Sequence, residues 1–201
     1  MAKDKYSMSF TSGALLYRES LLVAEMYAEI GDWQAVREKV IDENRLQMRT
    51  LNASRRIYRE VASRLKELTP AEMEVLLDGS RQDQNYLLWL GICKRYRFIY
   101  DFAVKVIREK FLRLDLDLTY DEYDVFFNDK AEWHPEVENI AESTRRKQRQ
   151  IVFKMMRDAE LLSARDRIIP TLLTPRVIET ILQDSPTHLA IFPISDLDVK
   201  Q

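Results

Sequence analysis

Residues 52–68 read NASRRIYREVASRLKEL, and this stretch decides the fold class that the sequence predicts. At 100° per residue, its inward positions fall within one arc of about 100°, and most of its cationic side chains lie opposite. The inward positions are Ser54, Ile57, Tyr58, Val61, Leu65 and Leu68. This two-faced pattern predicts an amphipathic helix over about 53–68, begun by Asn52, with one face in a core.

The chain before this helix has the same periodicity. Residues 14–30 and 33–43 are predicted helices, which Gly31 and Asp32 separate as a helix terminator and an N-cap. Three helices would therefore precede the loop after Leu68. We expect an N-terminal three-helix unit over 1–68 and a helical body over 69–201, or one continuous domain.

The chain after this helix also carries helix-start signals. Thr69-Pro70-Ala71-Glu72 and Thr119-Tyr120-Asp121-Glu122 are both capping boxes. We expect helices over 82–93 and 95–113, or one kinked helix across both, and further helices over 135–162 and 175–182. Two β-like segments, 168–170 and 187–194, are expected to pair as a small antiparallel ribbon. The predicted fold class is therefore all-α, a helical bundle with a small C-terminal β-ribbon.

Composition narrows the class of protein. The chain is 46% hydrophobic, enough to bury an ordinary core, and its formal net charge is -2. Its apolar stretches are too short to cross a bilayer, and the first ten residues contain no apolar signal segment. A single cysteine, Cys93, permits no internal disulfide. We therefore expect a cytoplasmic protein that does not span a membrane.

Catalytic and metal-binding patterns are scarce in this sequence. His134 and His188 are its only histidines, and no set of residues has the spacing of zinc ligands. The four glycines are scattered, so no phosphate-binding loop is present. Asp115, Asp117 and Asp121 resemble a calcium loop only faintly, because the required Gly and terminal Glu are missing. We expect no catalytic residue, no metal and no cofactor, and hence no enzyme.

The polar face of the 53–68 helix is the first candidate for nucleic-acid binding. Residues 45–66 carry seven Lys or Arg and only one Glu. The candidate residues are Asn52, Arg55, Arg56, Arg59 and Lys66. With the helix at 33–43 they resemble a helix-turn-helix layout, whose second helix enters the major groove of DNA. The alternative is an ordinary solvated face that happens to be basic.

A second cationic cluster lies on the long helix predicted from Pro135. It consists of Arg145, Arg146, Lys147 and Arg149. Arg side chains bind phosphate oxygens with two parallel hydrogen bonds, so such a cluster suits a nucleic-acid backbone. The alternative is neutralisation within the molecule, because residues 114–142 just upstream carry ten acids and one Lys.

Two segments resemble a known family. The first is Tyr6-Ser7-Met8-Ser9-Phe10-Thr11-Ser12-Gly13-Ala14-Leu15-Leu16, followed by Glu19-Ser20. The second is Met156-Arg157-Asp158-Ala159-Glu160-Leu161-Leu162, followed by Ile168-Ile169-Pro170 and Thr174-Pro175. Together they resemble the BrxA family of bacterial BREX phage-defence systems, over roughly residues 6–195.

This resemblance implies a fold and a set of partners. It implies a helical body similar to the RNA-binding antitermination factor NusB, binding to double-stranded DNA, and a supporting role in phage resistance. It also implies partners within the BREX system, namely a methyltransferase, an ATPase and a phosphatase-like protein. The predicted function is a non-enzymatic DNA-binding accessory protein. The alternative is a protein-protein adaptor, docking through residues 114–142, that does not bind nucleic acid physiologically.

Overall fold

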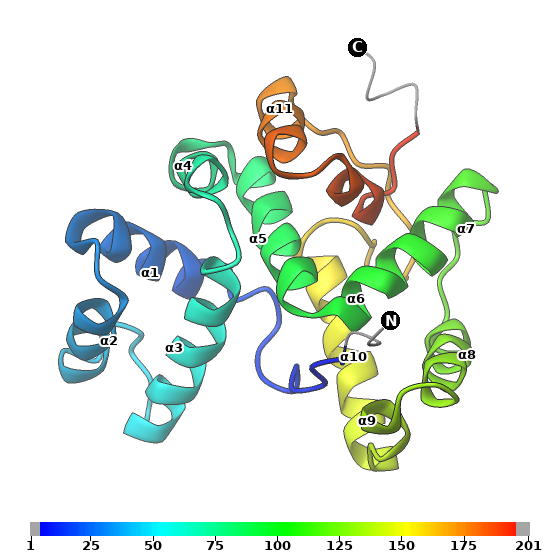
Figure 1. Ribbon diagram of the computed structural model, residues 1–201, viewed down its shortest axis with the longest axis horizontal. Helices are drawn as coiled ribbons and strands as arrows, with labels where there is room; N and C mark the ends of the chain where they lie inside the picture. Colours follow the sequence, from blue (N-terminus) through cyan, green and yellow to red (C-terminus); the bar gives the residue numbers. More distant parts are fainter. Residues whose placement is uncertain (1–4, 196–201) are drawn as a thin grey trace.

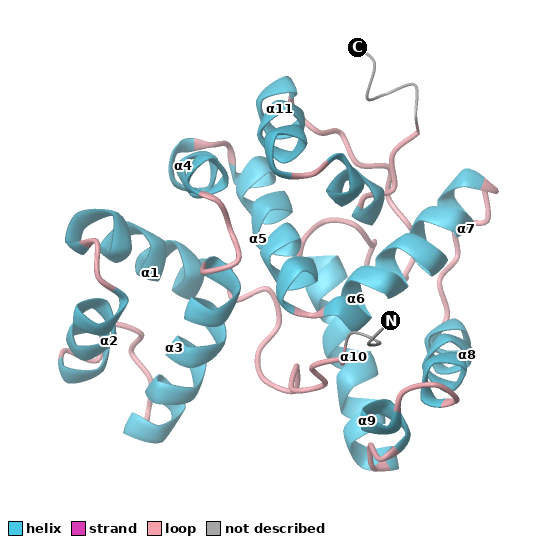
Figure 2. Ribbon diagram, viewed as in Figure 1, coloured by secondary structure: helices cyan, strands magenta, loops and turns pink. Residues whose placement is uncertain are grey.

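The computed structural model describes residues 5–195, and over this range the protein is built from helices joined by loops (Figures 1 and 2). Its α-helices are α1 Tyr17–Ile30, α2 Trp33–Asp42, α3 Leu51–Leu65, α4 Pro70–Asp78, α5 Arg81–Arg95, α6 Arg97–Phe102, α7 Glu109–Leu112, α8 Tyr120–Ala131, α9 Pro135–Glu138, α10 Glu142–Asp158 and α11 Pro175–Asp184. A π-helical segment, Ala103–Arg108, joins α6 to α7, and Pro186–Ile191 forms a 3-10 helix. The all-α prediction is confirmed.

The first three helices pack against one another, and α3 also packs against α5. Gly91 on α5 allows this close approach, because a Cβ there would lie 3.1 Å from the carbonyl oxygen of Arg64. The inward face predicted for the 53–68 stretch is buried, with Val61 fully inaccessible and Leu65 nearly so. The buried side of α3 therefore connects the N-terminal helices to the rest of the molecule (Figure 1).

Local capping signals predicted the helix starts well. Thr69 and Glu72 form the expected reciprocal pair, with the Thr69 amide donating to Glu72 at 2.8 Å. Thr119 and Glu122 do the same at the start of α8. The start of α3 was predicted wrongly by two residues. The side chain of Thr50, and not that of Asn52, caps this helix by accepting from the amide of Ala53 at 3.1 Å.

The long helix predicted over 135–162 is two helices, α9 and α10. The break falls at residues 139–141, where Ala141 is extended. The amide side chain of Asn139 donates to the carbonyl of Pro135 at 2.7 Å, which closes α9 after a single turn. Asparagine side chains compete with the helical backbone in this way, so the apolar periodicity alone could not reveal the break.

The predicted β-ribbon does not form, since residues 186–191 are a 3-10 helix and only isolated bridges occur within 5–195. Its one trace is the hydrogen bond from the Thr171 amide to the Pro193 carbonyl, at 3.1 Å. The apolar run packs instead on α5, where the indole of Trp89 donates to the carbonyl of Ile191 at 3.3 Å. A short apolar run looks the same in sequence whether it pairs as a strand or covers a helix.

The N-terminal segment runs through the interior before α1 begins. Phe10 is fully buried against Tyr96 and Phe98, with ring centroids 5.4 and 5.9 Å away. The Tyr6 hydroxyl donates to Asp101 at 2.6 Å, and the Met8 carbonyl accepts from Gln148 on α10 at 2.6 Å. The opening residues that carry the family resemblance are therefore packing residues.

Candidate nucleic-acid interface

Three arginines of α3 and the C-cap residue Lys66, together with Asn52, form one exposed stripe. Asn52, Arg55, Arg59 and Lys66 are all exposed, and their spacing of three, four and seven residues places them on one side of the helix. Arg56 is exposed beside them. We call these five residues the α3 stripe. The prediction that they share a solvent-facing surface is met in the structure, whereas DNA binding by them stays a prediction.

A buried polar network holds α3 in place beneath the stripe. The Glu60 carboxylate accepts from Arg64 at 3.0 Å and from the Tyr96 hydroxyl at 2.6 Å. Arg64, only 3% exposed, also donates to the carbonyl of Ala14 at 2.7 Å. Burial, together with the bond to Glu60, raises the pKa of the Tyr96 hydroxyl to about 12. The network ties α3 to the N-terminal segment and to the junction of α5 and α6.

The arginines of the stripe are available to a ligand. Across residues 5–195, Arg55, Arg56 and Arg59 make no salt bridge. Lys66 lies over the indole of Trp33, 5.3 Å from the ring centroid, and remains exposed. Within the described residues no carboxylate neutralises these three arginines, as a phosphate-binding surface requires.

The second predicted cluster is divided by the structure. Arg145 donates to Asp124 on α8 at 2.9 Å, and Arg149 pairs with the same carboxylate. Their guanidinium groups also lie over Phe127 and Tyr120, at 4.6 and 4.5 Å from the ring centroids. For these two arginines, the acidic segment upstream supplies the partner. They fasten α10 to α8.

The other two members of this cluster, Arg146 and Lys147, are exposed to solvent. Lys147 is exposed, and Arg146 makes only an exposed contact with Glu142 at 3.5 Å. In Figure 1 the N-terminal segment passes between α3 and α10. Among the described residues, the α3 stripe is the larger of the two groups of exposed cations without salt-bridge partners.

Replacing Asp124 by alanine tests the structural role of Arg145 and Arg149. The change removes charge-assisted hydrogen bonds from two partly buried arginines, so the free energy of unfolding should fall by about 1.5–3 kcal/mol. The matched control is Glu142→Ala, whose exposed pair with Arg146 should contribute less than about 1 kcal/mol. Urea denaturation measures both. If neither Asp124→Ala nor Glu142→Ala lowers the free energy of unfolding measurably, Asp124 does not hold α10 against α8. Arg145 and Arg149 would then again be candidates for binding phosphate.

Sequence reasoning missed an aromatic group beside the stripe. Tyr27 at the end of α1 and Trp33 at the start of α2 stack with ring centroids 3.9 Å apart and planes 13° apart. The exposed Arg37 lies one turn after Trp33. These aromatics belong to different helices on either side of Gly31, so the periodicity of one helix does not relate them. The sequence offered no signal for their contact.

The histidines and the cysteine have local roles. His134 contacts Glu136 at 3.3 Å, and His188 contacts Asp184 at 3.0 Å, which in turn pairs with Lys94. Burial raises the pKa of the Cys93 thiol, which therefore stays protonated. Among residues 5–195, no three His, Cys, Asp or Glu side chains gather as metal ligands would. In the same range, no helix has both the length and the apolar character needed to cross a membrane.

Comparison with known proteins places the chain in a family. The BrxA family model matches residues 4–185. A protein of Escherichia coli O9:H4 (strain HS), named BREX protein BrxA, is 24% identical over 132 residues, covering 66% of this chain and 62% of that protein. A protein of the same name from Bacillus cereus (strain H3081.97) is 26% identical over 167 residues, covering 81% of this chain and 82% of that one.

A solved structure supports the fold. The crystal structure of an uncharacterized protein from Magnetospirillum magneticum aligns with a TM-score of 0.77 at 19% identity, covering 94% of this chain and 98% of that one. This likeness concerns the fold alone. The family model spans the N-terminal segment, the α3 stripe and the body that holds them, and so this chain belongs to the BrxA family.

Proposed function

We propose that this protein is a DNA-binding accessory component of a BREX phage-defence system and acts in the cytoplasm without catalytic turnover. The observation that carries the proposal is the α3 stripe, in which three arginines are exposed without salt-bridge partners within residues 5–195. The names of the relatives in Escherichia coli and Bacillus cereus support the link to BREX. The partners implied by that link are the methyltransferase, the ATPase and the phosphatase-like protein.

The proposed mechanism is neutralisation of backbone phosphates by the stripe. Each phosphate that is neutralised releases condensed counterions, so the logarithm of affinity should fall linearly with the logarithm of salt concentration. The slope should be about -0.9 for each phosphate contacted on a duplex. Contacts with phosphates do not distinguish one base from another, so we expect the protein to bind DNA of many sequences.

The test is a titration of the purified protein against a random-sequence duplex at several salt concentrations. A linear salt dependence with a slope of about -3 to -4 would fit three or four phosphates on the stripe. No binding at low salt would remove DNA binding from the proposal.

A second candidate function, a protein-protein adaptor, is favoured by a separate surface. Large apolar side chains lie exposed around α7 and α8, with Leu114 82%, Val125 69% and Trp133 63% accessible. These three side chains lie within the acidic stretch 114–142, through which the adaptor alternative would dock, and interaction sites expose such apolar groups.

If this surface docks a BREX partner, Leu114→Asp/Val125→Asp should prevent co-purification with that partner and leave duplex affinity unchanged. Both positions are exposed, so little loss of stability is expected. Unchanged co-purification with all three implied partners would exclude this surface as the adaptor site.

A further inference from the structure

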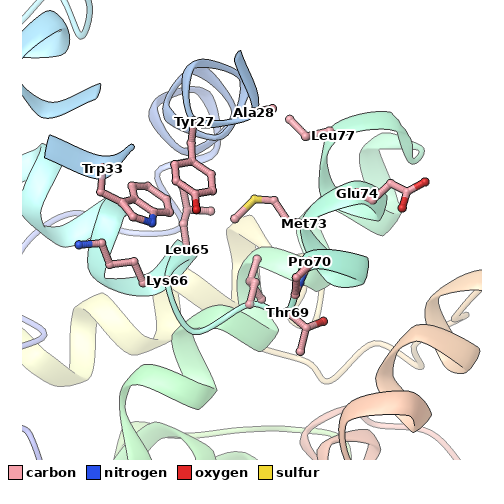
Figure 3. Close-up of a pocket in the computed structure, with 11 residues that line it drawn as sticks. Tyr27, Ala28, Trp33, Leu65, Lys66, Thr69, Pro70, Met73, Glu74 and Leu77 are labelled. Carbon is pink, nitrogen blue, oxygen red and sulfur yellow. The ribbon is translucent and has the colours of Figure 1, made fainter. Parts of the chain in front are cut away.

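A pocket of about 410 Å³ opens beside the α3 stripe, between the ends of α1 and α3 and the face of α4 (Figure 3). Its walls are mainly aromatic and aliphatic, and they include Tyr27, Leu68, Met73 and Leu77. Its volume lies in the range of pockets that hold small organic groups. Apart from Lys66, the residues that line this pocket take no part in the proposed phosphate binding by the stripe.

The pocket offers an aromatic face. In Figure 3 the ring of Tyr27 lies between Trp33 on one side and Met73 on the other. Trp33 stacks on one face of Tyr27, with planes 13° apart, and so fixes the orientation of the ring. Beyond Tyr27 the pocket wall continues to the thioether of Met73. A flat group entering the pocket would therefore meet an immobilised ring and a polarizable sulfur.

Lys66 connects this pocket to the stripe. It is the C-terminal member of the stripe and also lines the pocket, and it lies 5.3 Å from the centroid of Trp33. From Arg59 to Lys66 the helical rise is about 10 Å, a distance that one or two nucleotides of backbone span. A strand whose phosphates follow the stripe would thus bring a base to the mouth of the pocket.

We propose that the Tyr27–Met73 pocket receives one unpaired base of the nucleic-acid strand whose phosphates lie along the α3 stripe. The inference rests on the proposed DNA binding and extends it to a preference for duplexes with a single-stranded end or a displaced base. Stacking of a base on an aromatic ring accepts every base, because each has a flat π-face. The sequence tolerance of the stripe is therefore kept.

The charges around the pocket favour a base over an apolar side chain from a protein partner. Lys66 lines the pocket on the Trp33 side and is exposed there, where a backbone phosphate would pass, and the exposed Arg37 follows Trp33 by one turn of α2. Glu74 is the acid in the lining, and in Figure 3 its carboxylate points away from the Tyr27 ring. Cations beside one rim and an apolar interior match the two halves of a nucleotide, its phosphate and its base.

The experiment compares three hairpin ligands at one salt concentration. One is blunt, one has a three-nucleotide overhang containing 2-aminopurine, and one has an overhang of equal length made of abasic residues. Overhangs on the 5′ and 3′ sides are both tested. The base-containing overhang should bind about 5- to 150-fold tighter than the abasic one, and 2-aminopurine fluorescence should be quenched. The abasic overhang separates the base from the added phosphates.

Two variants place the base in this pocket. Tyr27→Leu removes the stacking face, and Ala28→Trp adds a large ring from an exposed position that lines the mouth. Each should abolish the gain from the overhang and leave affinity for the blunt hairpin unchanged. The matched control is Trp133→Ala, an exposed aromatic outside the pocket lining, which should keep the gain.

The outcomes separate this inference from the proposed function. Equal affinity for base-containing and abasic overhangs, with blunt binding intact, overturns the pocket and leaves the stripe. A gain that persists in both Tyr27→Leu and Ala28→Trp also overturns the pocket. If only the base-containing overhang binds, and Tyr27→Leu abolishes this binding, the pocket stands and duplex binding through the stripe fails.

Discussion

The double substitution Arg55→Glu/Arg59→Glu should lower affinity for a random duplex at least about 60-fold at 0.1 M salt. Two phosphate contacts account for this figure, because each contributes about 0.9 to the salt slope, or nearly tenfold at that salt concentration. Repulsion between the new carboxylates and the phosphates adds to the loss. The salt slope should become shallower by about 1.8. Fluorescence anisotropy at four or five salt concentrations measures both quantities.

The control is Arg113→Glu/Arg165→Glu, which changes the net charge by the same amount. Arg113 at the end of α7 and Arg165 after α10 are exposed positions outside the stripe. Their reversal should reduce affinity only through the long-range field, which is weak beyond a Debye length of about 10 Å at this ionic strength. If both double variants lose affinity equally, the stripe is not the binding site, and DNA responds to overall charge.

Glu60→Ala should lower the free energy of unfolding by about 3–5 kcal/mol. The substitution leaves the guanidinium of Arg64, 3% exposed, without its carboxylate, and uncompensated buried charges cost about this much. The Tyr96 hydroxyl loses its acceptor at the same time. Urea denaturation followed by circular dichroism measures the change.

Two further variants test the cause of this loss. Glu60→Gln keeps an oxygen acceptor for Tyr96 but removes the charge, so its loss should fall between those of the wild type and Glu60→Ala. Glu60→Leu/Arg64→Leu removes both charges and should recover part of the stability, because a buried pair replaced by apolar groups is often near neutral. A Glu60→Ala loss below about 1 kcal/mol would contradict the role assigned to this network.

The features that were predicted correctly depend on short stretches of sequence. The capping boxes at Thr69 and Thr119 act within four residues, and the burial of Val61 and Leu65 follows from the period of a single helix. The exposed α3 stripe was foreseeable for the same reason, because it lies on the polar face of the same amphipathic helix.

The features that the sequence left open, predicted wrongly or missed depend on tertiary contacts. Arg145 and Arg149 lie 21 and 25 residues from Asp124, and their pairing requires α8 to fold against α10. The β-ribbon was expected because residues 187–194 are apolar, but this run is apolar because it covers α5. The Tyr27 stack depends on the sharp reversal of the chain at Gly31, whose φ is 75°. The periodicity of the sequence reveals neither the pairing of these arginines with Asp124 nor the reversal of the chain at Gly31.

The buried N-terminal segment has a consequence for synthesis on the ribosome. Gln148, which donates to the Met8 carbonyl, is made 140 residues after it, or about 7–28 s later at ordinary rates of translation. The three helices α1–α3 can associate during that interval, while Phe10 and Tyr6 still lack the surfaces that cover them. The N-terminal segment thus leaves the exit tunnel well before the residues that cover it, and chaperones have a long opportunity to bind its apolar side chains.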